Sequence, residues 1–276
     1  KDRANDDARS EVRSIAPVHE LPLPKGDVTE GVVRVGDTVR RPHQASSAAV
    51  AAYLSHLERA GFDGAPRYLG LDDQGRDTLT FVAGDVASAS PELWAADDGL
   101  LASVADLVLA LHRASAGFDA DERLFARQPD DDGPTLVSHL DVTPQNVVVR
   151  NGRAVALIDF DLARRATPYL ECRNTAMHWV PICDPVDVYP AWHGIDQLRR
   201  LRLFVDRFGL AEELRRRFVA DEITRADLTW SRMKARAETQ GGGWARMWAE
   251  GVGDKIRRRQ SWLRATSAAI TAALTD

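Results

Sequence analysis

The sequence predicts an α+β chain with two lobes, a small antiparallel β-rich N-lobe and a larger, mainly helical C-lobe. Residues 21–82 form short segments separated by turns that contain Gly and Asp, which is typical of antiparallel strands. After residue 84 most apolar residues recur with the spacing of helices. We therefore divide the chain into a first lobe over residues 1–83 and a second lobe over residues 84–276.

The first lobe begins, after an arm or a first helix over residues 1–18, with a short predicted strand near Leu21. Two strands over residues 32–35 and 38–41 follow, joined by a hairpin turn at Gly36. A helix is predicted over residues 45–60, because its apolar residues share one face. Two further short strands are expected over residues 67–71 and 78–82.

The second lobe begins with a strongly periodic helix over residues 100–114, whose leucines and valines share one face. Residues 146–159 then alternate as a β-hairpin that turns at Asn151–Gly152. After Pro168 nearly all of the chain is helical in pattern, apart from the loop over residues 181–190. The hairpin is therefore the β exception within a helical lobe.

Composition limits the classes of function. The 276 residues are 44% hydrophobic and 28% charged, as in an ordinary soluble globular protein. The net charge of −5 argues against a nucleic-acid partner, because phosphate binding needs clustered Lys and Arg. Cys172 and Cys183 have no spacing that suggests zinc, so we expect two free thiols. Without a long apolar run or a signal-peptide core near the N-terminus, we expect no membrane partner and a cytoplasmic location.

The hairpin carries the chemistry that the sequence predicts. Asp141 and Asn146 lie on a loop before its first strand, and Asp159 directly follows its second strand. Phosphoryl transfer needs a carboxylate that orients or deprotonates the attacking hydroxyl, and oxygen ligands for the Mg²⁺ on the nucleotide phosphates. Alone, Asp141 or Asn146 is more often a cap or turn residue. Together with Asp159, after a buried-looking strand, they indicate a kinase.

This segment resembles the catalytic core of the aminoglycoside phosphotransferase and choline kinase-like family of small-molecule kinases, which are relatives of the protein kinases. The shared signature is His-x-Asp, then Asn five residues later, then an apolar strand that ends in Ile-Asp. Here it reads His139 to Asn146 and Leu157 to Asp159. The resemblance implies a bilobal protein-kinase-like fold that transfers the γ-phosphate of ATP or GTP to a hydroxyl of a small molecule.

The resemblance also implies roles for the motif residues. Asp141 would be the catalytic base, and Asn146 and Asp159 would ligate Mg²⁺. His139 is a further candidate catalytic residue, although bracing of the loop by a hydrogen bond is the favoured role. Asp161 is expected either to brace the loop or to add to the metal shell, with bracing favoured.

In the small lobe the resemblance implies a turn over the phosphates, and Gly26 and Gly31 are the candidates. The third strand would carry a cation to the phosphates. Arg41 is the first choice, because it shares a face with Val39, and Arg40 is the alternative. Each of these arginines could equally be a solvated surface residue. Candidates for receiving the adenine are Phe81 and Val82, which also read as buried strand residues.

Two features leave alternatives open. The family commonly places a glutamate in the helix after this strand, but the early turns here carry no acid and Glu58 lies at the far end. A nucleotide-binding pseudokinase is therefore the alternative function.

The acceptor could be an aminoglycoside-like antibiotic, an amino alcohol or a sugar-like metabolite. It would be framed by residues 177–181 and 183–187 or by late tryptophans such as Trp244 and Trp248. The choice between ATP and GTP and the oligomeric state stay open.

Overall fold

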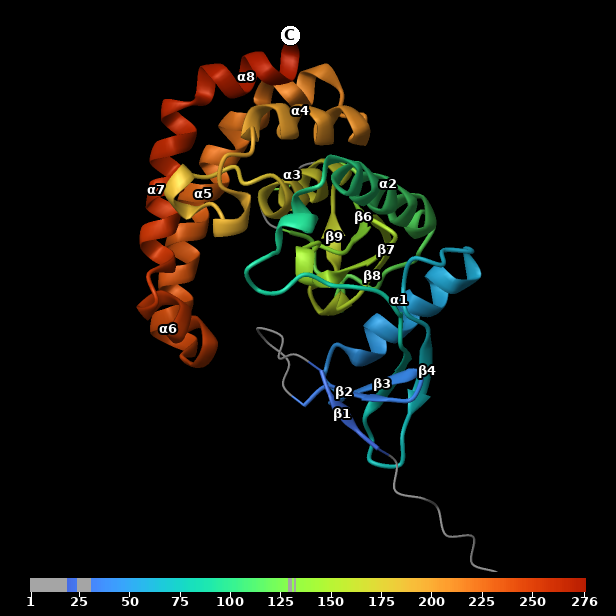
Figure 1. The fold of residues 1–276 in the computed structure, drawn as a ribbon. Helices are drawn as coiled ribbons and strands as arrows, with labels where there is room; N and C mark the ends of the chain where they lie inside the picture. Colours follow the sequence, from blue (N-terminus) through green and yellow to red (C-terminus); the bar gives the residue numbers. More distant parts are fainter. Residues whose placement is uncertain (1–18, 24–30, 129–130, 132) are drawn as a thin grey trace, which may run out of the picture.

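The computed structural model describes residues 19–23, 31–128, 131 and 133–276. Its small lobe is an antiparallel five-stranded sheet with the strand order β1-β2-β3-β5-β4 (Figure 1). The strands are β1 (Leu21–Pro22), β2 (Val33–Val35), β3 (Thr38–Arg41), β4 (Tyr68–Leu71) and β5 (Asp77–Thr80). Gly36, with φ +58°, makes the tight turn between β2 and β3, as the sequence predicts.

Helix α1 (Ser47–Arg59) connects the sheet to the large lobe. It contacts β4 on one side and α2 (Asp98–Ser115) on the other, and Figure 1 shows it running between them. Its buried face carries Tyr53, Leu54 and Leu57, which belong to the main hydrophobic core. The core is therefore continuous from the small lobe into the large one, which holds β3 at a defined place beside the second lobe.

The link between the lobes approaches the hairpin closely. Asp85 and Val149 exchange backbone hydrogen bonds of 2.9 and 2.8 Å. A Cβ added at Gly84, where φ is +150°, would lie 2.5 Å from Val148 Cγ1 and 2.7 Å from the Val149 carbonyl oxygen. This position therefore requires glycine, both for its backbone conformation and for the space.

Two short antiparallel strand pairs lie against α2 in the large lobe. The first pair is β7 (Val147–Arg150) with β8 (Arg153–Leu157), the hairpin that the sequence predicts, and Asn151 and Gly152 have φ values of +52° and +70° at its turn. The second pair is β6 (Leu136–Ser138) with β9 (Arg164–Ala166), and it was not predicted. The two pairs bracket the loop that carries the catalytic motif.

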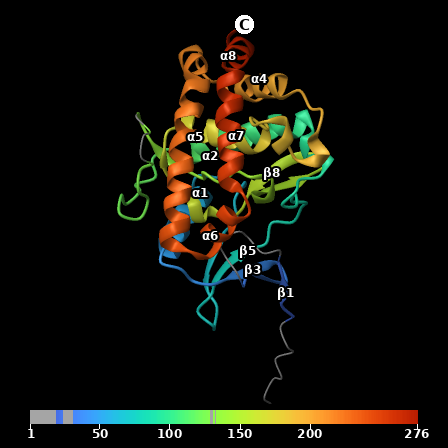
Figure 2. The same ribbon diagram turned by 90° about the vertical axis from the view of Figure 1, so that its left-hand side faces the viewer.

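Helices make up the rest of the large lobe. They are α3 (Pro168–Trp179), α4 (Gln197–Phe208), α5 (Glu212–Gln240), α6 (Gly242–Ala249), α7 (Val252–Ala265) and α8 (Ser267–Thr275). Single turns of 3₁₀-helix occur at Leu93–Ala96, Pro144–Asn146, Phe160–Leu162, Pro185–Asp187 and Pro190–Trp192. The long helix α5 packs against α7, and Figure 2 shows the two side by side. None of the described helices combines the length and the apolar character that a membrane span requires.

Candidate active site

The loop that the sequence predicts to be catalytic is built around a buried histidine. His139 has no exposed surface, its Nδ1 accepts a hydrogen bond from the Asp141 N–H (3.2 Å), and its Nε2 donates to the Ile158 carbonyl (3.0 Å). Burial lowers the pKa of His139 to about 4, so the ring is neutral at physiological pH. Because both ring nitrogens are used inside the loop, the geometry supports the bracing role of His139 rather than a chemical one.

Asp141 and Asn146 lie in direct contact. The Asn146 amide Nδ2 donates to Asp141 Oδ2 (2.7 Å) and to the Asp141 carbonyl oxygen (3.0 Å). The bond to Oδ2 fixes one carboxylate oxygen of Asp141, and the Oδ1 of Asn146 is thereby turned away from Asp141. The loop thus presents an oriented carboxylate and an amide oxygen next to one another.

Asp159 is brought to this loop by the end of the hairpin. The Ile158 N–H donates to the Asn146 carbonyl (2.9 Å), so Asp159 follows directly after a residue tied to both His139 and Asn146. Asp159 has a left-handed backbone with φ +63°, which is costly for a residue with a side chain and is typical of functional sites. Burial and the nearby Asp161 raise its pKa above the ordinary value, against the opposite effect of Arg41.

The donor set of Asn146 and Asp159 suits Mg²⁺ on a nucleotide. Within the described part of the chain, no three His, Cys, Asp or Glu side chains are grouped to hold a metal ion by themselves. Mg²⁺ commonly uses one or two carboxylates together with substrate phosphates and waters, rather than a cage made only of protein ligands. Burial is the main cause of the raised pKa of Asp159, and the nearby Asp161 adds to it.

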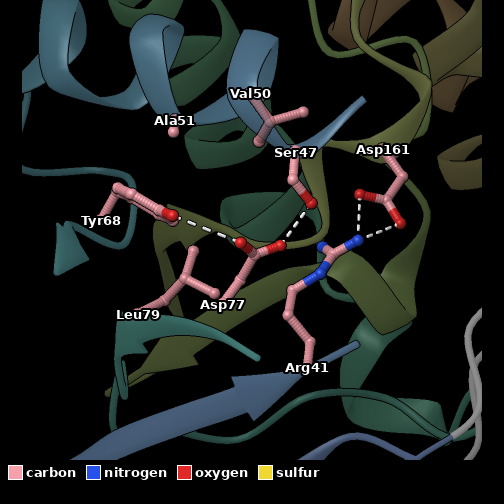
Figure 3. A pocket seen from close by; sticks show the side chains of 8 residues that line it. All are labelled: Arg41, Ser47, Val50, Ala51, Tyr68, Asp77, Leu79 and Asp161. Carbon is pink, nitrogen blue, oxygen red and sulfur yellow. Dashed lines mark hydrogen bonds and ion pairs between the residues drawn. The ribbon is translucent and has the colours of Figure 1, made fainter. Parts of the chain in front are cut away.

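Arg41 reaches this site from the small lobe. Its Nη2 donates to both carboxylate oxygens of Asp161 (Figure 3). Its Nη1 lies 3.7 Å from Asp159 Oδ1. Arg40 instead pairs with Asp72 on the small lobe, at 3.4 Å. Of the two arginines that the sequence offers, Arg41 is the one beside Asp159. Asp161 pairs with Arg41 of the small lobe, and its role in bracing the loop stays a prediction.

A small pocket separates Arg41 from helix α1. It is lined by Arg41, Ser47, Val50, Ala51, Tyr68, Asp77, Leu79 and Asp161, which Figure 3 labels. Asp77 is nearly buried and accepts hydrogen bonds from Ser47 Oγ and from Tyr68 (3.3 Å), and its Oδ1 lies 2.7 Å from His43 Nδ1. The only acid in α1, Glu58, lies 3.3 Å from Arg67, so it is committed elsewhere. The described acids that form ion pairs with Arg41 are therefore Asp159 and Asp161, and neither of them comes from α1.

Helix α3 supports the loop through residues that sequence reasoning missed. Leu140 has φ +59°, and two side chains of α3 bind its backbone N–H and its carbonyl. Glu171 accepts from the Leu140 N–H (3.0 and 3.1 Å), and Asn174 Nδ2 donates to the Leu140 carbonyl (2.6 Å). Burial raises the pKa of Glu171 to about 7. The only sequence feature that could have indicated this role is that Glu171 and Asn174 are three residues apart, and so share a face, near the start of the helix that follows the motif.

The remaining candidates are less directly tied to the site. Gly26 lies outside the described residues, and Gly31 has φ +80° at the start of the described chain before β2. The Phe81 N–H donates to the Asp37 carbonyl (2.8 Å), and the Arg34 guanidinium lies 3.7 Å from the centre of the Phe81 ring. The backbone N–H and the ring of Phe81 therefore both have partners within the small lobe. Val82 lies on the link that leads to Gly84.

Comparison with known proteins agrees with this geometry. Residues 116–204, which contain Asp141, Asn146 and Asp159, match the phosphotransferase enzyme family. The chain resembles this family over its catalytic core. It is also 29% identical over 201 residues to the trifolitoxin immunity protein of Rhizobium leguminosarum bv. trifolii, covering 70% of this chain and 76% of that protein.

The solved structures that share the fold include the following two. One is a choline/ethanolamine kinase family protein from Mesorhizobium loti, with TM-score 0.60, 14% identity and coverage of 96% and 94% of the two chains. The other is aminoglycoside 2'-phosphotransferase-IIIa in complex with GDP, with TM-score 0.57, 12% identity and coverage of 93% and 94%. At these identities the structures bear on the fold alone. The predicted bilobal protein-kinase-like fold and the predicted resemblance are confirmed, and the family match supports a small-molecule kinase.

Proposed function

We propose that this protein transfers the γ-phosphate of ATP or GTP to a hydroxyl of a small molecule, with Mg²⁺ and with Asp141 as the base. In this reaction the acceptor oxygen forms the new bond to the γ-phosphorus, and its proton goes to Asp141. The bond from the γ-phosphorus to the bridging oxygen breaks, and the nucleoside diphosphate leaves. The contact of Asn146 Nδ2 with Asp141 Oδ2 (2.7 Å) is the observation that carries the proposal, because it orients the base beside a candidate metal ligand.

Nucleotide binding is assigned to both lobes. Under this proposal residues 1–83 hold the nucleotide, with Arg41 directed at its phosphates, and residues 84–276 carry the catalytic loop and the acceptor site. Asn146 and Asp159 would hold Mg²⁺, which would neutralise the charge that develops on the phosphate oxygens. The chain's own part is to position the hydroxyl, fix Asp141 and supply Arg41, without a covalent intermediate.

A nucleotide-binding pseudokinase is the second candidate. The first three turns of α1 carry no acidic residue, and Arg41 is held by Asp161 instead of by an acid from this helix. A cation that stays on Asp161 would hinder productive phosphate binding. The intact set of Asp141, Asn146 and Asp159 favours the active enzyme.

The test measures nucleoside diphosphate release from ATP and from GTP with Mg²⁺, across aminoglycosides, choline-like amines and sugars. Acceptor-dependent release that is lost in Asp141→Asn supports the kinase. Nucleotide binding, shown separately by calorimetry, with no release on any acceptor would favour the pseudokinase.

A further inference from the structure

A second charged cluster lies behind the catalytic loop. Glu222 of α5 is fully buried and is surrounded by three arginines from three helices. The distances from its carboxylate oxygens are 3.6 Å to Arg173 Nη1 of α3, 3.0 Å to Arg225 Nη2 of α5 and 2.5 Å to Arg259 Nη2 of α7. Three positive charges therefore share one carboxylate, and among these four residues the formal charge is +2.

The cluster leaves buried polar atoms unpaired on both sides, since Glu222 Oε1 has no hydrogen-bond donor among the residues that the structure describes. The Nε atoms of Arg173 and Arg225 are buried and have no hydrogen-bond partner among the residues that the structure describes. Arg173 is only 7% exposed, so water does not replace the missing partner freely. Buried charges normally require both a counter-charge and satisfied donors, and this cluster has too few of each. An additional oxyanion would supply both.

The cluster is connected to the catalytic loop. Asn174 Nδ2 donates to the Leu140 carbonyl (2.6 Å), and Asn174 Oδ1 accepts from Arg225 Nη1 (2.9 Å). One side chain thus separates Arg225 from the residue that precedes Asp141. Arg225 and Arg259 also both contact Met177 Sδ, at 3.3 and 3.2 Å, in the segment where the sequence predicts the acceptor.

The two arginines remain reachable from solvent. Their side chains are 18% exposed for Arg225 and 13% exposed for Arg259, so they are neither sealed in the core nor on open surface. The nearby His178 adds no positive charge at physiological pH, since burial and these two arginines lower its pKa to about 4. Glu222 has a lowered pKa despite the opposing effect of burial, because the three arginines stabilise its charge.

Several groups that would attract an amine are already paired with the chain's own arginines. Asp187, in the other predicted acceptor segment, forms a two-bond ion pair with Arg258 (2.8 and 2.6 Å). Arg236 lies 4.6 Å from the centre of the Trp244 ring, and Arg257 lies 4.1 Å from that of Trp230. An ammonium group would have to displace these cations, whereas an oxyanion would add a counter-charge to three guanidinium groups that share one carboxylate.

We propose that Arg225 and Arg259 form an anion-binding subsite for the acceptor, so that the molecule phosphorylated carries a carboxylate or phosphate group as well as its hydroxyl. This inference rests on the proposed kinase function and narrows its acceptor to anionic molecules. Guanidinium groups bind both oxyanions in the same bidentate manner, so the two are distinguished by experiment.

The test measures binding by calorimetry to the full chain with Mg²⁺ and a non-hydrolysable ATP analogue, which keeps oxyanions out of the phosphate site. The probes are glucose, glucuronate, glucose 6-phosphate and choline. Glucuronate or glucose 6-phosphate is expected to bind at least about tenfold more tightly than glucose, and which of the two binds better identifies the oxyanion. Equal binding of glucose and its anionic counterparts, or tighter binding of choline, overturns the proposal.

Variants locate the binding. Arg225→Gln and Arg259→Gln are expected to remove the preference for the anionic probes, whereas Arg257→Gln, on an exposed residue of the same helix as Arg259, is expected to keep it. Glu222→Gln removes the competing carboxylate and is expected to tighten anion binding, which a variant that only harms folding would not do. Anion binding that is unchanged in both arginine variants overturns the subsite.

The subsite and the kinase can fail separately. Phosphorylation of choline or an aminoglycoside with no preference for anionic probes would leave the kinase standing and overturn the subsite. Arginine-dependent anion binding without any phosphoryl transfer would support the subsite and count against the kinase.

Discussion

Arg41 of strand β3 forms an ion pair with Asp161 of the large lobe, 120 positions further along the chain. Both side chains are largely buried, at 12% and 14% exposure, and Asp159 lies 3.7 Å from the same guanidinium. The cation proposed for the nucleotide phosphates is therefore held by carboxylates of the catalytic lobe. Incoming phosphates and Mg²⁺ would redistribute these charges, since the metal can take the carboxylates and the phosphates can take Arg41.

Replacing Arg41 by Gln is expected to weaken ATP binding. Loss of a charged hydrogen bond to phosphate costs about 1.5–3 kcal/mol, or roughly ten- to a hundredfold in Kd, as calorimetry would measure. Arg40→Gln is the matched control, because Arg40 pairs with Asp72 on the small lobe. Equal losses in both variants would argue against the assignment of Arg41.

Replacing Asp159 by Ala is expected to weaken binding of Mg²⁺-ATP by at least about tenfold. Loss of a group that only supports a metal ligand already costs about tenfold or more in metal affinity, and Asp159 would be a ligand itself. The reason is the loss of a carboxylate ligand, so ATP binding measured with EDTA should change much less. Asp119→Ala, at an exposed residue before the catalytic loop, serves as the control. Unchanged Mg²⁺ dependence in Asp159→Ala would remove this residue from the metal site.

Glu171 should make stability depend on pH. Burial raises its pKa from 4.5 to about 7, so the folded protein binds more protons than the unfolded chain between these values. The contribution of Glu171 to stability is therefore greatest below pH 4.5 and is lost as the pH rises through about 7. Glu171→Gln should remove this loss, which is on the order of 3 kcal/mol.

Denaturant titrations of parent and Glu171→Gln at several pH values between 4.5 and 8 measure that difference. The parent must be compared with the variant because buried His139 also makes stability depend on pH. Its pKa is lowered to about 4, so its contribution to stability decreases as the pH falls below 6.5, whereas that of Glu171 increases. Glu122→Gln, at an exposed residue, should follow the parent. Parallel curves for Glu171→Gln and the parent would show that the Glu171 pKa is not raised.

Gly84→Ala is expected to destabilise the protein by about 1–3 kcal/mol, because the new Cβ would overlap Val148 and the Val149 carbonyl. Gly75→Ala is the control: Gly75 also has positive φ, but a Cβ there meets no atom within 4 Å. A thermal or denaturant midpoint for Gly84→Ala that equals that of Gly75→Ala would show that the backbone conformation matters and the close approach does not.

The sequence predicts the hairpin correctly and groups the candidate site residues because both signals are local. Asp141, Asn146 and Asp159 fall within one short segment, and the Asn151–Gly152 turn fixes how its two strands pair. Alternation along β3 likewise favours Arg41 over Arg40, and the structure places Arg41 beside Asp159. Such patterns need no knowledge of the rest of the chain.

The rest depends on packing between distant segments. Strands β6 and β9 are three residues each, which is too short to show alternation. They form because the chain after the hairpin runs back beside residues 136–138 and pairs with them. The pairing of Arg41 with Asp161 and the meeting of Arg225 with Arg259 around Glu222 require helices and lobes to be in place first. Charges on separate helices carry no signal of their partners in a single sequence.

The most direct test of the central claim follows radiolabelled γ-phosphate from ATP to an acceptor, with parent protein and Asp141→Asn side by side. We expect the parent to label an acceptor only with Mg²⁺ present, and Asp141→Asn to bind ATP nearly as well while transferring almost no label. Equal transfer by the two proteins would contradict the assignment of Asp141 as the base and, with it, this account of the site.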